Sequence, residues 1–266
     1  MSRSEISRPL LAPIVTLLAL LGLLLLGTPL IAQETAEAAT DEVEEAAEPE
    51  PWWSGSAGLS FLATGGNTDT QTLGVELSAE RRPAPWGLSV EARFDRAEED
   101  DVRTAERYLL GFRGTRAICD RWDFFAGLKG EQDEFAGLDQ RLLVEIGGAF
   151  KAISKPKHTL VGEIGLTWTD ENRIAPAEDE DSIGALLGFT DTWKLSETSI
   201  LEERLIFYPN FDDSDDWRID YQIGLTAALT DRLAVKLGYE LRYRNQPILG
   251  AEKDDSTTKV SLVASF

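Results

Sequence analysis

The sequence predicts an all-β protein, an antiparallel transmembrane β-barrel of about twelve strands, from three observations. An apolar segment near the N-terminus is typical of an exported protein. From Trp53 onward apolar and polar residues alternate, and the connections between the alternating segments are short and long by turns. Successive side chains of a strand point to opposite faces, so this alternation indicates strands with one apolar face. Short turns at one end and longer loops at the other are typical of outer-membrane barrels.

The N-terminal region predicts a secretory signal peptide over residues 1–32. Arg3 and Arg8 precede an almost wholly apolar run over residues 10–26, and Ala32 is a suitable last residue before cleavage. The alternative is an uncleaved membrane anchor, because the apolar run is long for a signal. The rest of the chain has no apolar run approaching the roughly 20 residues of a spanning helix.

Residues 33–51 predict a disordered acidic tether in the periplasm. The segment holds eight acidic residues and no basic one, and it is otherwise rich in Ala, Thr and Pro. It cannot bury enough apolar surface to offset the loss of chain entropy on folding. A transient helix is the alternative, since alanines are frequent.

Residues 52–266 form the predicted barrel. The clearest strand is at 233–244, where Leu237 and its alternate neighbours are apolar while Lys236 and its alternate neighbours are polar or glycine. At about twelve residues it suits a tilted membrane strand, which needs about 9–11. The facing of 198–208 is ambiguous. We expect strands at 53–63, 70–81, 86–96, 103–116, 121–131, 140–153, 158–170, 181–193, 198–208, 217–230, 232–244 and 256–266.

The connections predict how the barrel is oriented. Short ones lie at 82–85, 117–120, 154–157, 194–197 and 230–231, and longer ones at 64–69, 97–102, 132–139, 171–180, 209–216 and 245–255. Long loops of bacterial barrels face the cell exterior, so both termini are expected in the periplasm.

Aromatic residues support a membrane location. Tryptophans stand at strand ends, as expected for rings at a membrane interface, and the last predicted strand ends in Phe266. A terminal aromatic strand predicts recognition by the outer-membrane assembly machinery. The soluble alternative is a β-sandwich with the same apolar faces in its core. The tryptophans concerned are Trp53, Trp86, Trp122, Trp168, Trp193 and Trp217.

The charge and cysteine content narrow the functional classes. The formal net charge is -21, which disfavours nucleic acid as a partner. Contact with cations fits better. Cys119 is the single cysteine, so no internal disulfide can form.

Charged residues on the predicted inward faces are the candidate site. Both signs alternate there, which favours ion pairs across neighbouring strands that fill or narrow the lumen. The lumen-facing candidates are Glu76, Glu91, Arg93, Arg113, Lys129, Arg141, Glu145, Glu163, Arg218, Asp220, Lys236, Glu240 and Arg242.

The long predicted loops are acidic, and their oxygens suit hard cations such as Ca²⁺ or Mg²⁺. The weak metal candidates are Asp212, Asp213, Asp215 and Asp216. Solvated surface is the simpler interpretation. Cation bridging to lipopolysaccharide is the sharper one, since basic residues gather at the short turns instead.

The chain is expected not to be an enzyme and to need no cofactor. His158, the single histidine, lies at a predicted short turn, and no Gly-x-Ser-x-Gly elbow occurs. Zinc ligands are also lacking. The remaining enzymatic hypothesis is an outer-membrane hydrolase that uses lumen carboxylates.

Several short motifs carry a family resemblance. They are Gly-Asn-Thr-Asp-Thr at 66–70, Phe-Tyr-Pro-Asn at 207–210, Leu-Thr-Asp-Arg-Leu at 229–233, Tyr-Glu-Leu-Arg-Tyr at 239–243 and the terminal run 255–266. Through them, residues from about 52 to 266 resemble the family of salt-induced outer-membrane proteins, the YdiY-like domain of unknown function. The resemblance implies an outer-membrane barrel and no particular activity.

Three functions follow, in order of preference. The first is a pore or narrow channel for small solutes or ions, with outer-membrane lipid and lipopolysaccharide as its surroundings. The second is a structural or salt-stress barrel with a lumen plugged by charges. The third is the carboxylate hydrolase.

Overall fold

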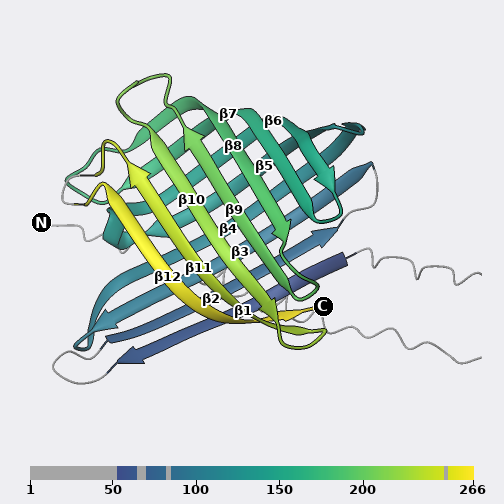
Figure 1. The fold of residues 1–266 in the computed structure, drawn as a ribbon. Helices are drawn as coiled ribbons and strands as arrows, with labels where there is room; N and C mark the ends of the chain where they lie inside the picture. Colours follow the sequence, from purple (N-terminus) through teal and green to yellow (C-terminus); the bar gives the residue numbers. More distant parts are fainter. Residues whose placement is uncertain (1–52, 65–69, 82–84, 249–250) are drawn as a thin grey trace, which may run out of the picture. The chain divides into compact units, whose positions relative to one another are not determined.

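The computed structural model describes residues 53–64, 70–81, 85–248 and 251–266 as one closed β-barrel of twelve strands (Figure 1). The predicted fold class and strand number are therefore confirmed. The expected signal peptide and tether lie outside the described residues. No helix in the described part of the chain is long and apolar enough to cross a membrane.

The strands follow the predicted segments closely. They are β1 (Trp53–Thr64), β2 (Thr70–Arg81), β3 (Trp86–Glu99), β4 (Val102–Cys119), β5 (Trp122–Asp133), β6 (Leu138–Lys155), β7 (His158–Arg173), β8 (Glu180–Lys194), β9 (Ser199–Tyr208), β10 (Arg218–Ala228), β11 (Leu233–Arg244) and β12 (Asp254–Ser265).

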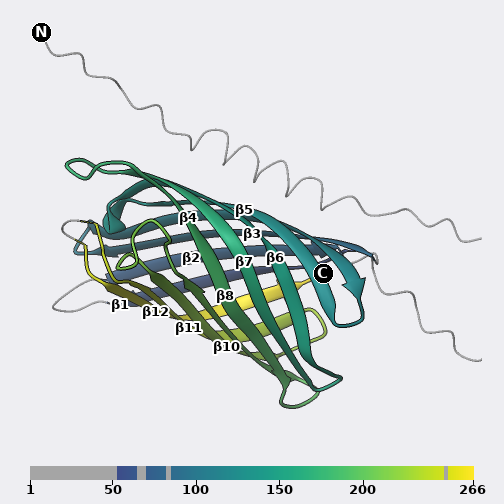
Figure 2. The same cartoon turned by 90° about the horizontal axis from the view of Figure 1, so that it is seen from above.

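Each strand pairs antiparallel with its neighbours in sequence, and β1 closes the ring against β12 (Figures 1 and 2). The last residue of the sequence completes this seam, because Gly55 and Phe266 exchange backbone N–H···O bonds of 2.9 and 3.0 Å. The start of β1 and the end of β12 thus share one end of the barrel. The short turns lie at that end, which we call the short-turn end; the other is the long-loop end.

Apolar side chains cover the outside of the barrel. Leu237 of β11 is 49% exposed, while Lys236 beside it reaches Glu76 of β2 inside. Val260 and Leu262 of β12 are exposed in the same way, and Lys259 and Ser261 line an internal cavity. A closed ring leaves no unpaired strand edge, so these faces can be apolar without exposing backbone hydrogen-bonding groups.

Several expected long connections are shorter than predicted, among them those at 97–102, 132–139 and 171–180. The loop expected at 97–102 is a two-residue turn, because β3 runs to Glu99 and β4 begins at Val102. Asp100 and Asp101 both have positive φ, 49° and 62°, as the tight turn of a hairpin requires. The loop expected at 132–139 is shortened by β5 on one side and β6 on the other, and a 3₁₀ turn at Glu134–Ala136 joins them.

The lumen contains an apolar cluster in addition to charges. Phe125 of β5 is fully buried, and its ring stands against Gly147 of β6. A Cβ on Gly147 would lie 2.6 Å from that ring and collide with the carbonyl oxygen of Ile164, so glycine allows the close approach. The cluster consists of Phe125, Leu143, Ala149, Leu186, Ile206 and Tyr208, from β5, β6, β8 and β9.

Candidate functional site

The interior at the short-turn end holds a cavity of about 1070 Å³, which we call the short-turn cavity. Its rim includes Trp86, Ser154 and Phe266. Its deeper lining is charged, with Glu91 and Lys129 3.5 Å apart among the side chains there.

A second cavity of about 300 Å³, the side cavity, lies against β1 and β9–β12. Glu76 of β2 and Lys236 of β11 form an ion pair of 3.4 Å in its wall. Glu202 and Arg204 of β9 line both cavities, so this strand stands where the two spaces meet.

Farther toward the long loops, arginines and glutamates link strands across the lumen. We call this set the crossing network and define it by five arginines and three glutamates. All eight side chains are 22% exposed or less. The members are Arg93, Arg107, Glu131, Arg141, Glu171, Glu240, Arg242 and Arg244.

Some ion pairs of the crossing network join adjacent strands, and others join strands that are not neighbours. Glu240 of β11 accepts from Arg107 of β4 at 2.8 Å and from Arg93 of β3 at 3.1 Å. Arg242 of β11 reaches Glu131 of β5 at 3.2 Å. In a ring of twelve strands, β5 and β11 stand six positions apart in either direction, so this pair spans the barrel.

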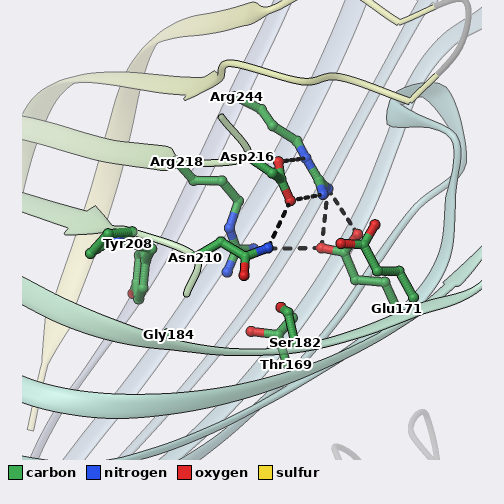
Figure 3. A pocket seen from close by; sticks show the side chains of 11 residues that line it. Thr169, Glu171, Ser182, Gly184, Tyr208, Asn210, Asp216, Arg218 and Arg244 are labelled. Carbon is green, nitrogen blue, oxygen red and sulfur yellow. Dashed lines mark hydrogen bonds and ion pairs between the residues drawn. The ribbon is translucent and has the colours of Figure 1, made fainter. Parts of the chain in front are cut away.

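Glu171 connects the crossing network to a long loop (Figure 3). This glutamate of β7 is 4% exposed and accepts from Arg141 and Arg244, each at 2.8 Å. Arg244 also donates to Asp216, in the loop before β10, at 2.9 Å. The space that remains beside these groups is about 20 Å³, roughly enough for one water molecule.

This arrangement holds the guanidinium groups of the lumen in fixed orientations. A guanidinium presents donors in a rigid fork, so two carboxylates can hold it in one orientation. Several such forks side by side form a charged constriction between the long loops and the short-turn cavity.

The predicted lumen charges take part in these contacts beyond neighbouring strands. Arg113 of β4 contacts Glu145 of β6 and Glu163 of β7, each at 2.6 Å. Arg218 lies 3.8 Å from Glu171. Asp220 has no base within 4.0 Å among the described residues, although it lies on the same strand as Arg218. Pairing across neighbouring strands alone was therefore too local an expectation.

Sequence reasoning missed several members of the site. Glu171 was assigned to an acidic loop, and Glu131 was placed at the end of a strand but not selected. Both are buried, within β7 and β5. Arg107 and Arg204 lie on β4 and β9 and were not selected. Arg107 could have been found, since it precedes Arg113 at an even spacing on the same strand face.

The acidic residues of the run 212–216 accept hydrogen bonds from their own loop and from neighbouring strands. Asp212 accepts from the backbone N–H of Ile183 at 2.8 Å, Asp213 accepts from that of Asp215 at 2.9 Å, and Asp216 holds Arg244. No group of three or more metal-ligating side chains occurs among the residues that the structure describes. Contact with divalent cations remains a prediction.

His158 lies at the first position of β7, at the short-turn end. Its Nε2 is 2.8 Å from Asp191, and its ring stacks on Trp193 with centroids 3.7 Å apart. Asp191 also accepts from the indole N–H of Trp193 at 2.9 Å. His158 does not line either the short-turn or the side cavity.

The chain is similar to a protein family of unknown function and to solved outer-membrane barrels. The family model described as "Protein of unknown function, DUF481" matches residues 57–266. The "Uncharacterized protein YdiY" of Escherichia coli (strain K12) is 20% identical over 209 residues, which are 78% of this chain and 81% of that protein. An outer membrane channel from Pseudomonas putida F1 aligns over 86% of this chain and 100% of its own, with 12% identity and a TM-score of 0.49. The NanC porin aligns over 80% and 97%, with 11% identity and a TM-score of 0.48.

Proposed function

We propose that this chain, which belongs to the family of proteins of unknown function DUF481, is a narrow outer-membrane channel with a charged constriction. Its solutes are small ions or small polar molecules. The observation that carries the proposal is the division of the lumen into a wide cavity at the short-turn end and the crossing network beyond it.

The outer surface supports a membrane location. Exposed apolar side chains occur on strands around the barrel, including Phe61, Ile164, Leu237 and Val260. A soluble protein would expose this band to water at a large cost in free energy, whereas lipid accepts it. The charged side chains of the crossing network are turned inward, where they do not meet hydrocarbon.

Exposed tryptophans, one of them beneath an arginine, indicate a membrane–water interface at the short-turn end. Trp53, Trp86, Trp122 and Trp193 are each at least 45% exposed and stand at the short-turn ends of their strands. Arg116 lies over the ring of Trp86 at 5.0 Å. Rings with a wet edge and an apolar body favour the membrane–water interface.

In this proposal the short turns and both chain termini face the periplasm, while the acidic loops face outward. Short turns on the periplasmic side are the rule for bacterial barrels. The short-turn cavity is then the periplasmic entrance. Fractionation with outer membranes, and faster gel migration unheated than boiled, test the location.

Conductance tests the channel itself. The purified full-length barrel is inserted into planar bilayers and recorded in symmetrical KCl. We expect small, discrete openings, because the crossing network leaves only narrow passages. Absence of openings in KCl, NaCl and CaCl₂ would reject the channel.

A plugged structural barrel is the second candidate, and one observation favours it. The crossing network joins β11 to β3, β4, β5 and β7, so charged side chains bridge the lumen between the short-turn cavity and the long loops. Under this alternative the lumen stays silent in bilayers, while removal of the network destabilises the barrel.

A further inference from the structure

Arg204 of β9 differs from the paired bases of the lumen. Lys129, Lys151 and Lys236 each have a carboxylate within 4.0 Å, as do Arg113 and the arginines of the crossing network. Within the described chain, Arg204 forms no such ion pair, and its Nε is buried without a hydrogen-bond partner. A guanidinium without a carboxylate partner in a largely enclosed space costs free energy unless something outside the protein compensates its charge.

The position of Arg204 gives access to a ligand. Its side chain lines both the short-turn cavity and the side cavity. The larger of these, about 1070 Å³, is of the size that holds small organic ligands. On the neighbouring strands Arg204 is level with Thr190 and Gln222, which are uncharged.

The charges nearest to Arg204 favour the binding of an added anion. Lys129 and Arg204 both act on Glu91, and Lys129 holds that carboxylate at only 3.5 Å. Lys129 and Arg204 also repel each other, so an anion between them relieves that repulsion. Glu202, on the same strand face two residues earlier, is exposed and contributes the opposite charge at the cavity rim.

We propose that Arg204 is the centre of a binding site for a small oxyanion, a carboxylate, sulfate or phosphate group of a solute that enters the short-turn cavity. The guanidinium donates to such a group through its terminal nitrogens, in a fork of charge-assisted hydrogen bonds. Lys129 supports the anion from β5, and Glu202 disfavours a second negative charge on the same solute. The inference deepens the proposed channel by placing a solute site on its path.

The test is equilibrium binding to the full-length barrel folded in neutral detergent micelles. Isothermal titration with sodium sulfate, sodium phosphate and sodium acetate as separate probes measures affinity without any need for transport. We expect saturable binding of at least one of the three, with one ion per barrel. The ranking of the three identifies the oxyanion class.

Substitutions distinguish specific binding at Arg204 from non-specific attraction of anions to the positive charges of the lumen. Arg204→Gln should weaken binding about tenfold or more, as expected for loss of hydrogen bonds to a charged group. Arg204→Lys should retain part of the affinity, and Glu202→Gln should tighten binding. Lys236→Gln is the matched control, since it also removes one positive charge from the side-cavity wall, and it should bind like the wild type.

Two results would overturn the site: no saturable binding of any probe by the wild type, or equal loss in Arg204→Gln and Lys236→Gln. Heat-modifiable gel mobility of every variant shows that the barrel has folded. Binding without conductance would reject the channel and retain the Arg204 site. Conductance without binding would reject the Arg204 site and retain the channel.

Discussion

Arg242 of β11 donates through Nη1 to two carboxylates of β5, Glu131 at 3.2 Å and Asp133 at 2.9 Å. Its other terminal nitrogen contacts Asp255 of the adjacent strand β12. One guanidinium therefore ties the wall formed by β11 and β12 to the strand on the opposite side of the ring. The lumen at this level is bridged by side chains.

Glu131→Gln should destabilise the barrel by about 3–5 kcal/mol, the cost of removing one partner from a buried ion pair. Glu131 is 9% exposed and accepts from Arg107, Arg141 and Arg242, so three cations lose their shared carboxylate. Urea unfolding in detergent or lipid measures the change. Glu98→Gln is the control, because Arg96 beside Glu98 is well exposed, and it should change stability little.

The double variant Arg107→Ala, Arg242→Ala should increase single-channel conductance several-fold over the wild type. Both side chains span the lumen, and their removal widens the narrowest level. Planar-bilayer recordings of variants with normal heat-modifiable mobility check this. Unchanged conductance would show that the current-limiting level lies elsewhere.

Leu237→Arg should destabilise the barrel by about 2–4 kcal/mol if this exposed side chain of β11 meets lipid near the bilayer midplane. Lys236→Arg, one residue earlier on the inner face, keeps the charge opposite Glu76 and should cost less. Refolding titrations into lipid vesicles measure both. Equal tolerance of the two changes would contradict the assignment of faces.

Gly147→Ala should destabilise the barrel by about 1–3 kcal/mol, as overpacking does. The added methyl would meet the Phe125 ring at 2.6 Å and the Gly165 Cα at 2.7 Å, and neither can move freely. Gly162→Ala in β7 is the matched control, because a Cβ there meets nothing within 4 Å. Urea midpoints of the two variants should differ clearly, and similar midpoints would argue against tight packing of β5 on β6 and β7.

Much of the fold could be predicted because alternation is a local property. Each strand shows its apolar face in its own residues, as Leu237 and Lys236 do on β11, and the turn lengths give the order around the ring. The predicted family resemblance is confirmed by the match over residues 57–266. The strand 199–208 was ambiguous because Ile206 and Tyr208 are apolar on the inner face, where they join the lumen cluster.

The site was harder to predict because its contacts are not local. The apolar alternation of β7 ends at Trp168, so the sequence does not indicate that this strand continues to Arg173 and turns Glu171 inward. Partners such as Arg242 and Glu131 lie 111 residues apart in the chain. Which inward charges meet depends on the tilt and register of the closed ring, which single-strand patterns do not contain.

The seam between β1 and β12 has a consequence for how the barrel is built. Every other described strand pair joins neighbours in sequence, so the sheet can grow one hairpin at a time. The seam joins residues about 200 positions apart. It pairs Ser56–Ser60 with Ser261–Ser265, and Gly55 with Phe266, a shorter ladder than those of the other described pairs. Closing it requires the largest loss of chain entropy. Ring closure is therefore the expected slow step of assembly, and the same short ladder is where a strained barrel would first come apart.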